Sequence, residues 1–96
     1  MTREKCIEIL SKAAPHIKEK YGVKSLSLFG STARGTNTEE SDIDLFVDMP
    51  PKALMLVGLG DYLEELLGTS VDLVRSSNFL RPFLLKEIKR DGITIF

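Results

Sequence analysis

The 96-residue sequence predicts a single α+β domain spanning residues 1–96, an α/β sandwich built from a small mixed β-sheet and helices. Three observations predict this class. Apolar residues recur at helical spacing in some segments, other segments alternate apolar and polar residues as strands do, and the two kinds of segment follow one another in the order α-β-β-α-β-α-β. With 43% hydrophobic and 28% charged residues, the composition is ordinary for a globular domain.

The first element is expected to be a helix over residues 2–21. Thr2 is suited to cap its start, Gly22 is suited to end it, and the apolar residues recur at helical spacing, at Cys6, Leu10, Ala13 and Ile17. Pro15 lies inside this segment. Because proline has no backbone N–H and its ring crowds the preceding turn, we expect it to kink or split the helix.

Two strands should follow, over residues 23–29 and 43–47. In the first, Leu26 and Leu28 share one face, because successive side chains on a strand point to opposite sides. In the second, residues 43, 45 and 47 are the apolar ones. Between the strands, Gly30 to Gly35 is expected to form a loop or a short helical turn.

The second half of the chain predicts a helix over residues 52–67, a short strand over 71–74, a helix over 79–90 and a closing strand over 93–96. Proline near a helix start and glycine near its end support the helix boundaries. The stretch 52–59 is apolar on nearly every side. It is therefore either well buried or part of a contact with a partner or a second copy of the chain.

Charge and cysteine usage bound the environment. The net charge of −1 gives no global field that would attract DNA or RNA, so no direct DNA binding is expected. A single cysteine, Cys6, excludes an intramolecular disulfide and is expected in the core. The charged first twenty residues do not resemble a signal peptide, and no apolar run is long enough to span a membrane. We expect a cytoplasmic protein with no membrane contact.

A glycine–serine turn follows the first predicted strand. Gly30 lets the backbone approach a bound group closely, Ser31 offers a hydroxyl, and N–H groups at the start of a helical turn favour anions. Arg34 adds a fixed positive charge able to contact phosphate. Taken alone, Gly30 and Ser31 also fit a plain strand-to-helix turn.

Three aspartates form the second candidate group. Because residues 43, 45 and 47 face the core, Asp42 and Asp44 must share the opposite face of their strand. Asp72 lies in the same way within the apolar strand 71–74, and it would join the pair if the two strands are neighbours. Clustered carboxylates repel one another unless a cation such as Mg²⁺ lies between them. Asp-x-Asp alone also fits a solvated strand edge.

Together these residues resemble the signature of the nucleotidyltransferase superfamily that includes DNA polymerase beta. The sequence has Gly30-Ser31, ten intervening residues, Asp42-Ile43-Asp44, and then Asp72. It is most similar to the minimal nucleotidyltransferases, which include the MntA-type antitoxins of HEPN/MNT toxin–antitoxin pairs. The resemblance is close over residues 23–74 and looser elsewhere, and it implies the nucleotidyltransferase fold.

The resemblance also implies roles for the candidate residues. Gly30 and Ser31 would hold the triphosphate of the nucleotide, and Asp42 and Asp44 would bind two Mg²⁺ ions. Asp72 would complete the metal that faces the acceptor and help to deprotonate it. The family assigns no fixed role to Arg34, so its nucleotide contact is our inference from charge.

The implied function is Mg²⁺-dependent transfer of AMP from ATP to a hydroxyl, a tyrosine, of a partner HEPN toxin, so that the chain acts as an antitoxin. Two alternatives stay open at this point. The chain could neutralise its toxin by binding alone, or it could transfer a nucleotide to a small molecule or to RNA. Intact aspartates favour catalysis, since a pure binding protein has no need of uncompensated carboxylates.

Overall fold

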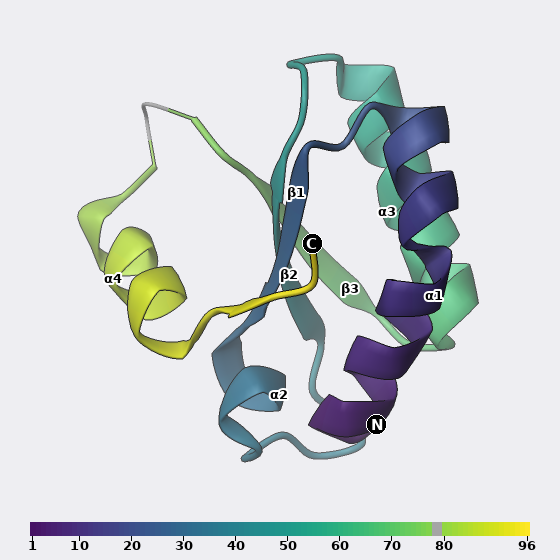
Figure 1. The fold of residues 1–96 in the computed structure, drawn as a ribbon. Helices are drawn as coiled ribbons and strands as arrows, with labels where there is room; N and C mark the ends of the chain where they lie inside the picture. The colour runs from purple at the N-terminus through teal and green to yellow at the C-terminus, as the bar shows by residue number, and fades with distance from the viewer. Residues whose placement is uncertain (78–79) are drawn as a thin grey trace.

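The computed structural model describes residues 1–77 and 80–96 and confirms the predicted fold class. A mixed sheet of four strands carries helices on both sides (Figure 1). The predicted turn after the first strand is a short helix of its own, and the predicted start of the last helix at residue 79 lies outside the described residues. The elements are α1 (Arg3–Tyr21), β1 (Ser25–Phe29), α2 (Gly30–Arg34), β2 (Ile43–Asp48), α3 (Ala53–Leu67), β3 (Val71–Arg75), α4 (Pro82–Asp91) and β4 (Ile93–Thr94).

The strand order is β3-β2-β1-β4. Strand β1 is antiparallel to both β2 and β4, whereas β2 and β3 are parallel. Helix α3 connects β2 to β3, as a parallel pair requires, because the chain must cross back before it can run in the same direction. In the β2–β3 register, Asp44 stands opposite Asp72. The sheet therefore brings the second and third candidate aspartates side by side.

Most of the hydrophobic core lies between the sheet and the pair α1 and α3, which cover the same face (Figure 1). Strands β1 and β2 turn their apolar residues to this side, as the alternation predicted. Several large side chains are completely buried there, among them Leu10, Ile17, Leu26, Leu28, Ile43, Leu45, Leu59 and Leu63. Cys6 is also buried, and burial raises the pKa of its thiol to about 11. It is a core residue, as expected.

Helix α1 begins and ends as its sequence predicts. The Thr2 hydroxyl accepts a hydrogen bond from the backbone N–H of Lys5 at 3.1 Å, and Gly22 ends the helix with a φ of 67°. The helix is continuous through Pro15, so the expected split does not occur. Pro15 and Ser11, the residue four positions earlier, are both exposed. Water can therefore replace the backbone hydrogen bond that proline removes.

The sequence left open whether the apolar run at the start of α3 is buried in the core or exposed for a contact. The structure shows residues of both kinds. Leu59 is completely buried, and Leu63 and Leu67 continue the core-facing stripe. Leu54 is 88% exposed and Val57 is 61% exposed. Within this run, Leu54 and Val57 are therefore accessible to a partner or a second copy, and Leu59 is not.

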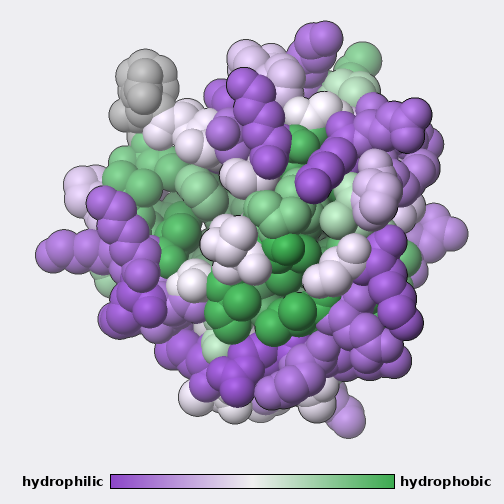
Figure 2. Space-filling model, in the orientation of Figure 1, coloured by the Kyte–Doolittle hydropathy of each residue, from purple (hydrophilic) through white to green (hydrophobic). Residues whose placement is uncertain are grey.

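Helix α4 lies on the opposite side of the sheet from α1 and α3 (Figure 1), and none of its residues is buried. Figure 2 shows an apolar area in the middle of the molecule, where the C-terminal residues cross the view in Figure 1, surrounded by hydrophilic residues. Ile93, Ile95 and Phe96 at this end of the chain are only partly buried against the core. Within the described part of the chain, no helix has the length and apolarity to span a membrane.

Candidate active site

The turn between β1 and α2 is built around Gly30. Its φ is 72°, in the left-handed region that side chains disfavour. A Cβ at this position would lie 2.9 Å from the Asp44 Cγ and would collide with one of its carboxylate oxygens. Phe29, the residue before Gly30, is the register partner of Asp44 on β2. Glycine is therefore required here both by the backbone conformation and by the carboxylate packed against it.

Asp44 is the most strongly perturbed carboxylate of the site. Its pKa is raised to about 6, first by burial and then by the negative charges of Asp72, Asp42 and Glu87. Arg34 acts in the opposite direction. Asp42, immediately before β2, and Asp72, the second residue of β3, are both exposed. The structure thus brings the three candidate aspartates into one electrostatic group, with Asp44 at its least hydrated position.

The carboxylates of the described residues do not make a metal site on their own. Among residues 1–77 and 80–96, no group of three or more His, Cys, Asp or Glu side chains is arranged so that it could hold a metal ion by itself. Mg²⁺ in nucleotide-processing enzymes takes one or two carboxylates and completes its shell with water and substrate phosphates. Burial raises the pKa of Asp44 most, and the negative charges of Asp72, Asp42 and Glu87 raise it further. The carboxylate oxygens of the aspartates are ligands that a hard divalent cation prefers, and its charge would reduce their mutual repulsion.

Ser31 lies at the start of α2 and leaves its side chain available. Its backbone carbonyl accepts hydrogen bonds from the N–H of Thr36 at 3.0 Å and from the N–H of Gly35, which ends the helix. Within the described residues its hydroxyl makes no hydrogen bond. The side chain is partly exposed. Ser31 can therefore offer its hydroxyl to a ligand without breaking an internal contact.

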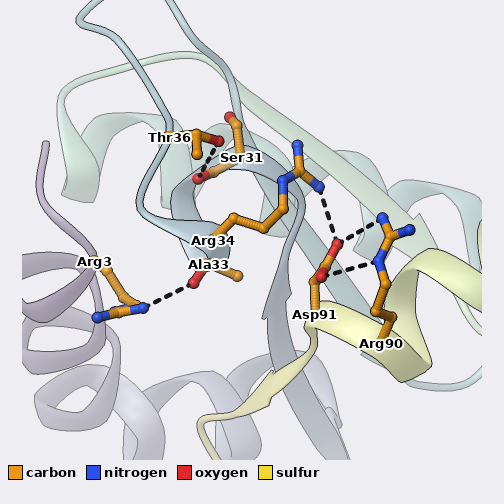
Figure 3. A network of polar contacts seen from close by, with 7 residues as sticks. All are labelled: Arg3, Ser31, Ala33, Arg34, Thr36, Arg90 and Asp91. Atoms are coloured by element: carbon orange, nitrogen blue, oxygen red, sulfur yellow. Dashed lines mark hydrogen bonds and ion pairs between the residues drawn. The ribbon is translucent and has the colours of Figure 1, made fainter.

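Arg34, the last residue of α2, is held by α4. One of its Nη atoms lies 2.9 Å from the Asp91 carboxylate, which also accepts from Arg90 (Figure 3). On the other side, Arg3 of α1 donates to the carbonyl of Ala33 at 3.1 Å. The short helix is thus fastened to both neighbouring helices, and the predicted phosphate-binding arginine already has a carboxylate partner.

Sequence reasoning missed two acidic residues of α4. Glu87 acts on Asp44, and Asp91 binds Arg34. In the sequence of α4, basic residues outnumber these two acids, as Lys86, Lys89 and Arg90. A signal was nevertheless present, since Asp91 is the last residue of a helix, where an acidic side chain is unfavourable.

The three candidate aspartates do not lie in the main surface hollow described for this structure. A hollow of about 570 Å³ lies beyond the C-terminal end of α2, bounded by residues of the N-terminus and of the loop before β2. None of the three aspartates lines it. Asp42 and Asp72 are exposed, and Asp44 is partly buried. The hollow is lined by Met1, Thr2, Arg3, Glu4, Gly35, Asn37, Thr38 and Glu39.

Comparison with known proteins gives one consistent result. The model of the nucleotidyltransferase domain family matches residues 10–95. A Methanocaldococcus jannaschii protein provisionally named a protein adenylyltransferase is 44% identical over 90 residues, which cover 92% of each chain. The protein adenylyltransferase MntA of Thermococcus cleftensis is 36% identical over 97 residues, which cover 99% of this chain and 97% of that protein.

Solved structures agree. A provisionally identified minimal nucleotidyltransferase has a TM-score of 0.77 at 34% identity, with 97% of this chain and 95% of that chain covered. A chain of a Shewanella oneidensis complex, described as a tri-AMPylated HEPN toxin with an MNT antitoxin, has a TM-score of 0.68 at 20% identity. That match covers 99% of this chain and 72% of the other. At such low identity the second match shows a shared fold alone.

Proposed function

Because the chain belongs to the nucleotidyltransferase domain family, we propose that this enzyme transfers AMP from ATP to a hydroxyl of a partner protein. The observation that carries the proposal is the register of Asp44 opposite Asp72 on parallel strands, next to the glycine turn. That register places two carboxylates beside the backbone turn in which the family resemblance places the triphosphate. Asp42 adds a third carboxylate at the same end of β2.

In the proposed reaction the acceptor oxygen attacks the α-phosphorus of ATP. The bond from that phosphorus to the oxygen bridging the α- and β-phosphates breaks, pyrophosphate leaves, and the acceptor loses its proton. Gly30 lets the backbone approach the triphosphate, Ser31 offers a hydroxyl to it, and Arg34 adds positive charge. Asp72, on the exposed β3 side of the pair, is suited to face the acceptor and take its proton.

Asp42, Asp44 and Asp72 would hold Mg²⁺, two ions by the family resemblance. When bound, these ions would neutralise charge on the phosphates and on the attacking oxygen. Arg34 supplies one positive charge, part of which its ion pair with Asp91 offsets, whereas Asp42, Asp44 and Asp72 are three carboxylates. The proposal therefore includes a dependence of transfer on Mg²⁺.

We further propose that the acceptor is a tyrosine of a HEPN-domain toxin and that the chain acts as its antitoxin in the cytoplasm, where ATP is available. The relative from Thermococcus cleftensis carries the name protein adenylyltransferase MntA and matches over almost the whole of both chains. The similar fold from Shewanella oneidensis comes from a complex whose toxin is AMPylated. Asp72 is exposed, so the side chain proposed to face the acceptor is accessible to a macromolecule.

The test is to incubate the chain with ATP, Mg²⁺ and the HEPN protein encoded beside it, and to weigh both proteins by intact mass spectrometry. We expect the partner to gain the mass of one or more AMP groups. The gain should disappear with EDTA and with a chain carrying Asp42→Asn and Asp44→Asn. A stable complex whose masses do not change would contradict transfer and support neutralisation by binding. Replacing the modified partner tyrosine by phenylalanine tests the acceptor.

A further inference from the structure

Asp91 is an unusual residue for its position. It is the last residue of α4, where the partial negative charge at the end of a helix makes a carboxylate unfavourable. Its side chain is nevertheless only 9% exposed and accepts from two arginines, Arg34 of α2 and its neighbour Arg90 (Figure 3). Hydrogen bonds from Arg90 and Arg34 lower the pKa of Asp91. Local helix stability does not account for an aspartate here, whereas the two arginines do.

The two arginines are not equivalent. Arg90 donates from Nε at 3.1 Å and from Nη2 at 3.0 Å, so it engages both carboxylate oxygens. Arg34 donates from Nη1 alone, at 2.9 Å. A guanidinium has five N–H donors in a rigid plane, and among the described residues the other donors of Arg34 bind nothing. Arg34 is therefore held at one end while the rest of its donors stay free.

Arg34 ends the short helix that begins at Gly30, the residue packed against Asp44. Its charge acts on Asp44, the carboxylate packed against Gly30. Two guanidiniums on one carboxylate leave this cluster with a net charge of about +1, so pairing with Asp91 does not cancel the attraction for phosphate. Without Asp91, the long side chain of Arg34, whose exposed fraction is 38%, would be free to sample many rotamers in solvent.

We propose that Asp91 is a positioning residue, which fixes the guanidinium of Arg34 beside the aspartates so that its remaining donors meet the incoming triphosphate. This inference rests on the proposed function. The pair joins residues 57 positions apart in the chain, so the last helix contributes to nucleotide binding without touching the nucleotide. Arg34 supplies the phosphate contact, and Asp91 removes the cost of ordering it.

The experiment measures Mg·ATP affinity by titration, and KM and kcat for transfer to the partner, for four variants with the parent. Asp91→Asn keeps the shape and removes the charge. We expect it to raise Kd and KM for ATP roughly tenfold, or about 1.4 kcal/mol, with kcat changed by less than about twofold. Asp61→Asn is the control, because it makes the same charge change on the exposed surface of α3 and should leave both constants unchanged.

Arg34→Ala, and the double variant Arg34→Ala with Asp91→Asn, separate positioning from general structural support. If Asp91 acts through Arg34, adding Asp91→Asn to Arg34→Ala should change ATP affinity by less than about twofold. An additive loss, a loss confined to kcat, or tighter ATP binding by Asp91→Asn would each overturn the proposal. Melting temperatures of all variants show whether a loss comes from unfolding. A parent that does not bind Mg·ATP overturns the proposed function itself, whereas a binding parent with a normal Asp91→Asn overturns only the positioning role.

Discussion

The two faces of the sheet differ in almost every property. The face covered by α1 and α3 holds nearly all the buried apolar side chains. The other face carries Asp44 and Asp72, and α4, the helix on that side, buries none of its own residues. The difference shows how a small domain divides its work. Apolar burial on one face stabilises the folded state, and this stabilisation offsets the repulsion between the carboxylates on the other face.

The largest expected effect tests that division directly. Leu45→Ala removes a completely buried side chain of β2 and should lower the free energy of unfolding by about 3–5 kcal/mol. Leu85→Ala, from the partly buried side of α4, should cost less than about 2 kcal/mol, because less apolar area is lost. Urea denaturation followed by circular dichroism measures both. Equal losses would show that the two faces share the stability.

Asp72→Asn should affect chemistry and leave the fold intact. The substitution keeps the shape of the side chain and removes one charge from a repulsive group. We expect nucleotide affinity to fall modestly and transfer to the partner to fall by more than ~100-fold, roughly 3 kcal/mol of transition-state stabilisation. A nucleotide titration and a transfer assay on the same preparation check this. Transfer within about tenfold of the parent would exclude Asp72 as a ligand of the acceptor-side metal.

Gly30→Ala should destabilise the protein more than Gly35→Ala does. Both residues have positive φ, 72° and 79°, and in both cases alanine adds strain of about 1 kcal/mol or more. Only Gly30 faces Asp44, whereas nothing lies within 4 Å of a Cβ at Gly35. Displacing the carboxylate should bring the cost of Gly30→Ala to about 2 kcal/mol or more. Thermal unfolding of the two variants gives the comparison, and equal costs would mean that the carboxylate yields freely.

The metal-free stability of the parent should depend on Asp44 protonation. The pKa of Asp44 is raised to about 6, so between pH 4 and 6 the folded state keeps a proton that the unfolded state releases. This group therefore favours the folded state at pH 4, and the advantage is lost as the pH rises through 6. In EDTA, Asp44→Asn should be more stable than the parent by about 1–2 kcal/mol at pH 7, with no such gain at pH 4. A gain independent of pH would show that charge is not its cause.

Thr32→Val should produce the smallest effect, and a favourable one. Thr32 is completely buried in α2, and in the described structure its hydroxyl has no hydrogen-bond partner. Valine has the same shape without the unsatisfied group, so the free energy of unfolding should rise by about 1 kcal/mol. Thr36→Val is the control, because the exposed Thr36 hydroxyl reaches the Ser31 carbonyl at 3.5 Å. A loss of stability in Thr32→Val would reveal a partner for this hydroxyl.

The spacing of apolar residues predicted the local features of the fold, namely the helix bounds and the buried faces of the strands. The alternation in β1 and β2 placed their apolar residues correctly, and helices α1 and α3 lie within two residues of their predicted bounds. The meeting of Asp44 and Asp72 was predicted only on the condition that their strands are neighbours, which the sheet fulfils. The pairing of Arg34 with Asp91 could not be predicted, because it depends on how α4 docks against α2. The basic character of α4 also hid Glu87 and Asp91.

The packing of Asp44 against Gly30 makes the two positions epistatic. A lineage that abandons nucleotide transfer can replace Asp44 in a single mutational step, since a smaller side chain leaves the glycine undisturbed. Beginning with Gly30 is costlier, because a Cβ there must displace the carboxylate while Asp44 is still present. When this site loses its function, replacement of Asp44 is therefore expected before replacement of Gly30. Inactive descendants that retain the glycine should therefore be more common than descendants that retain only the acid.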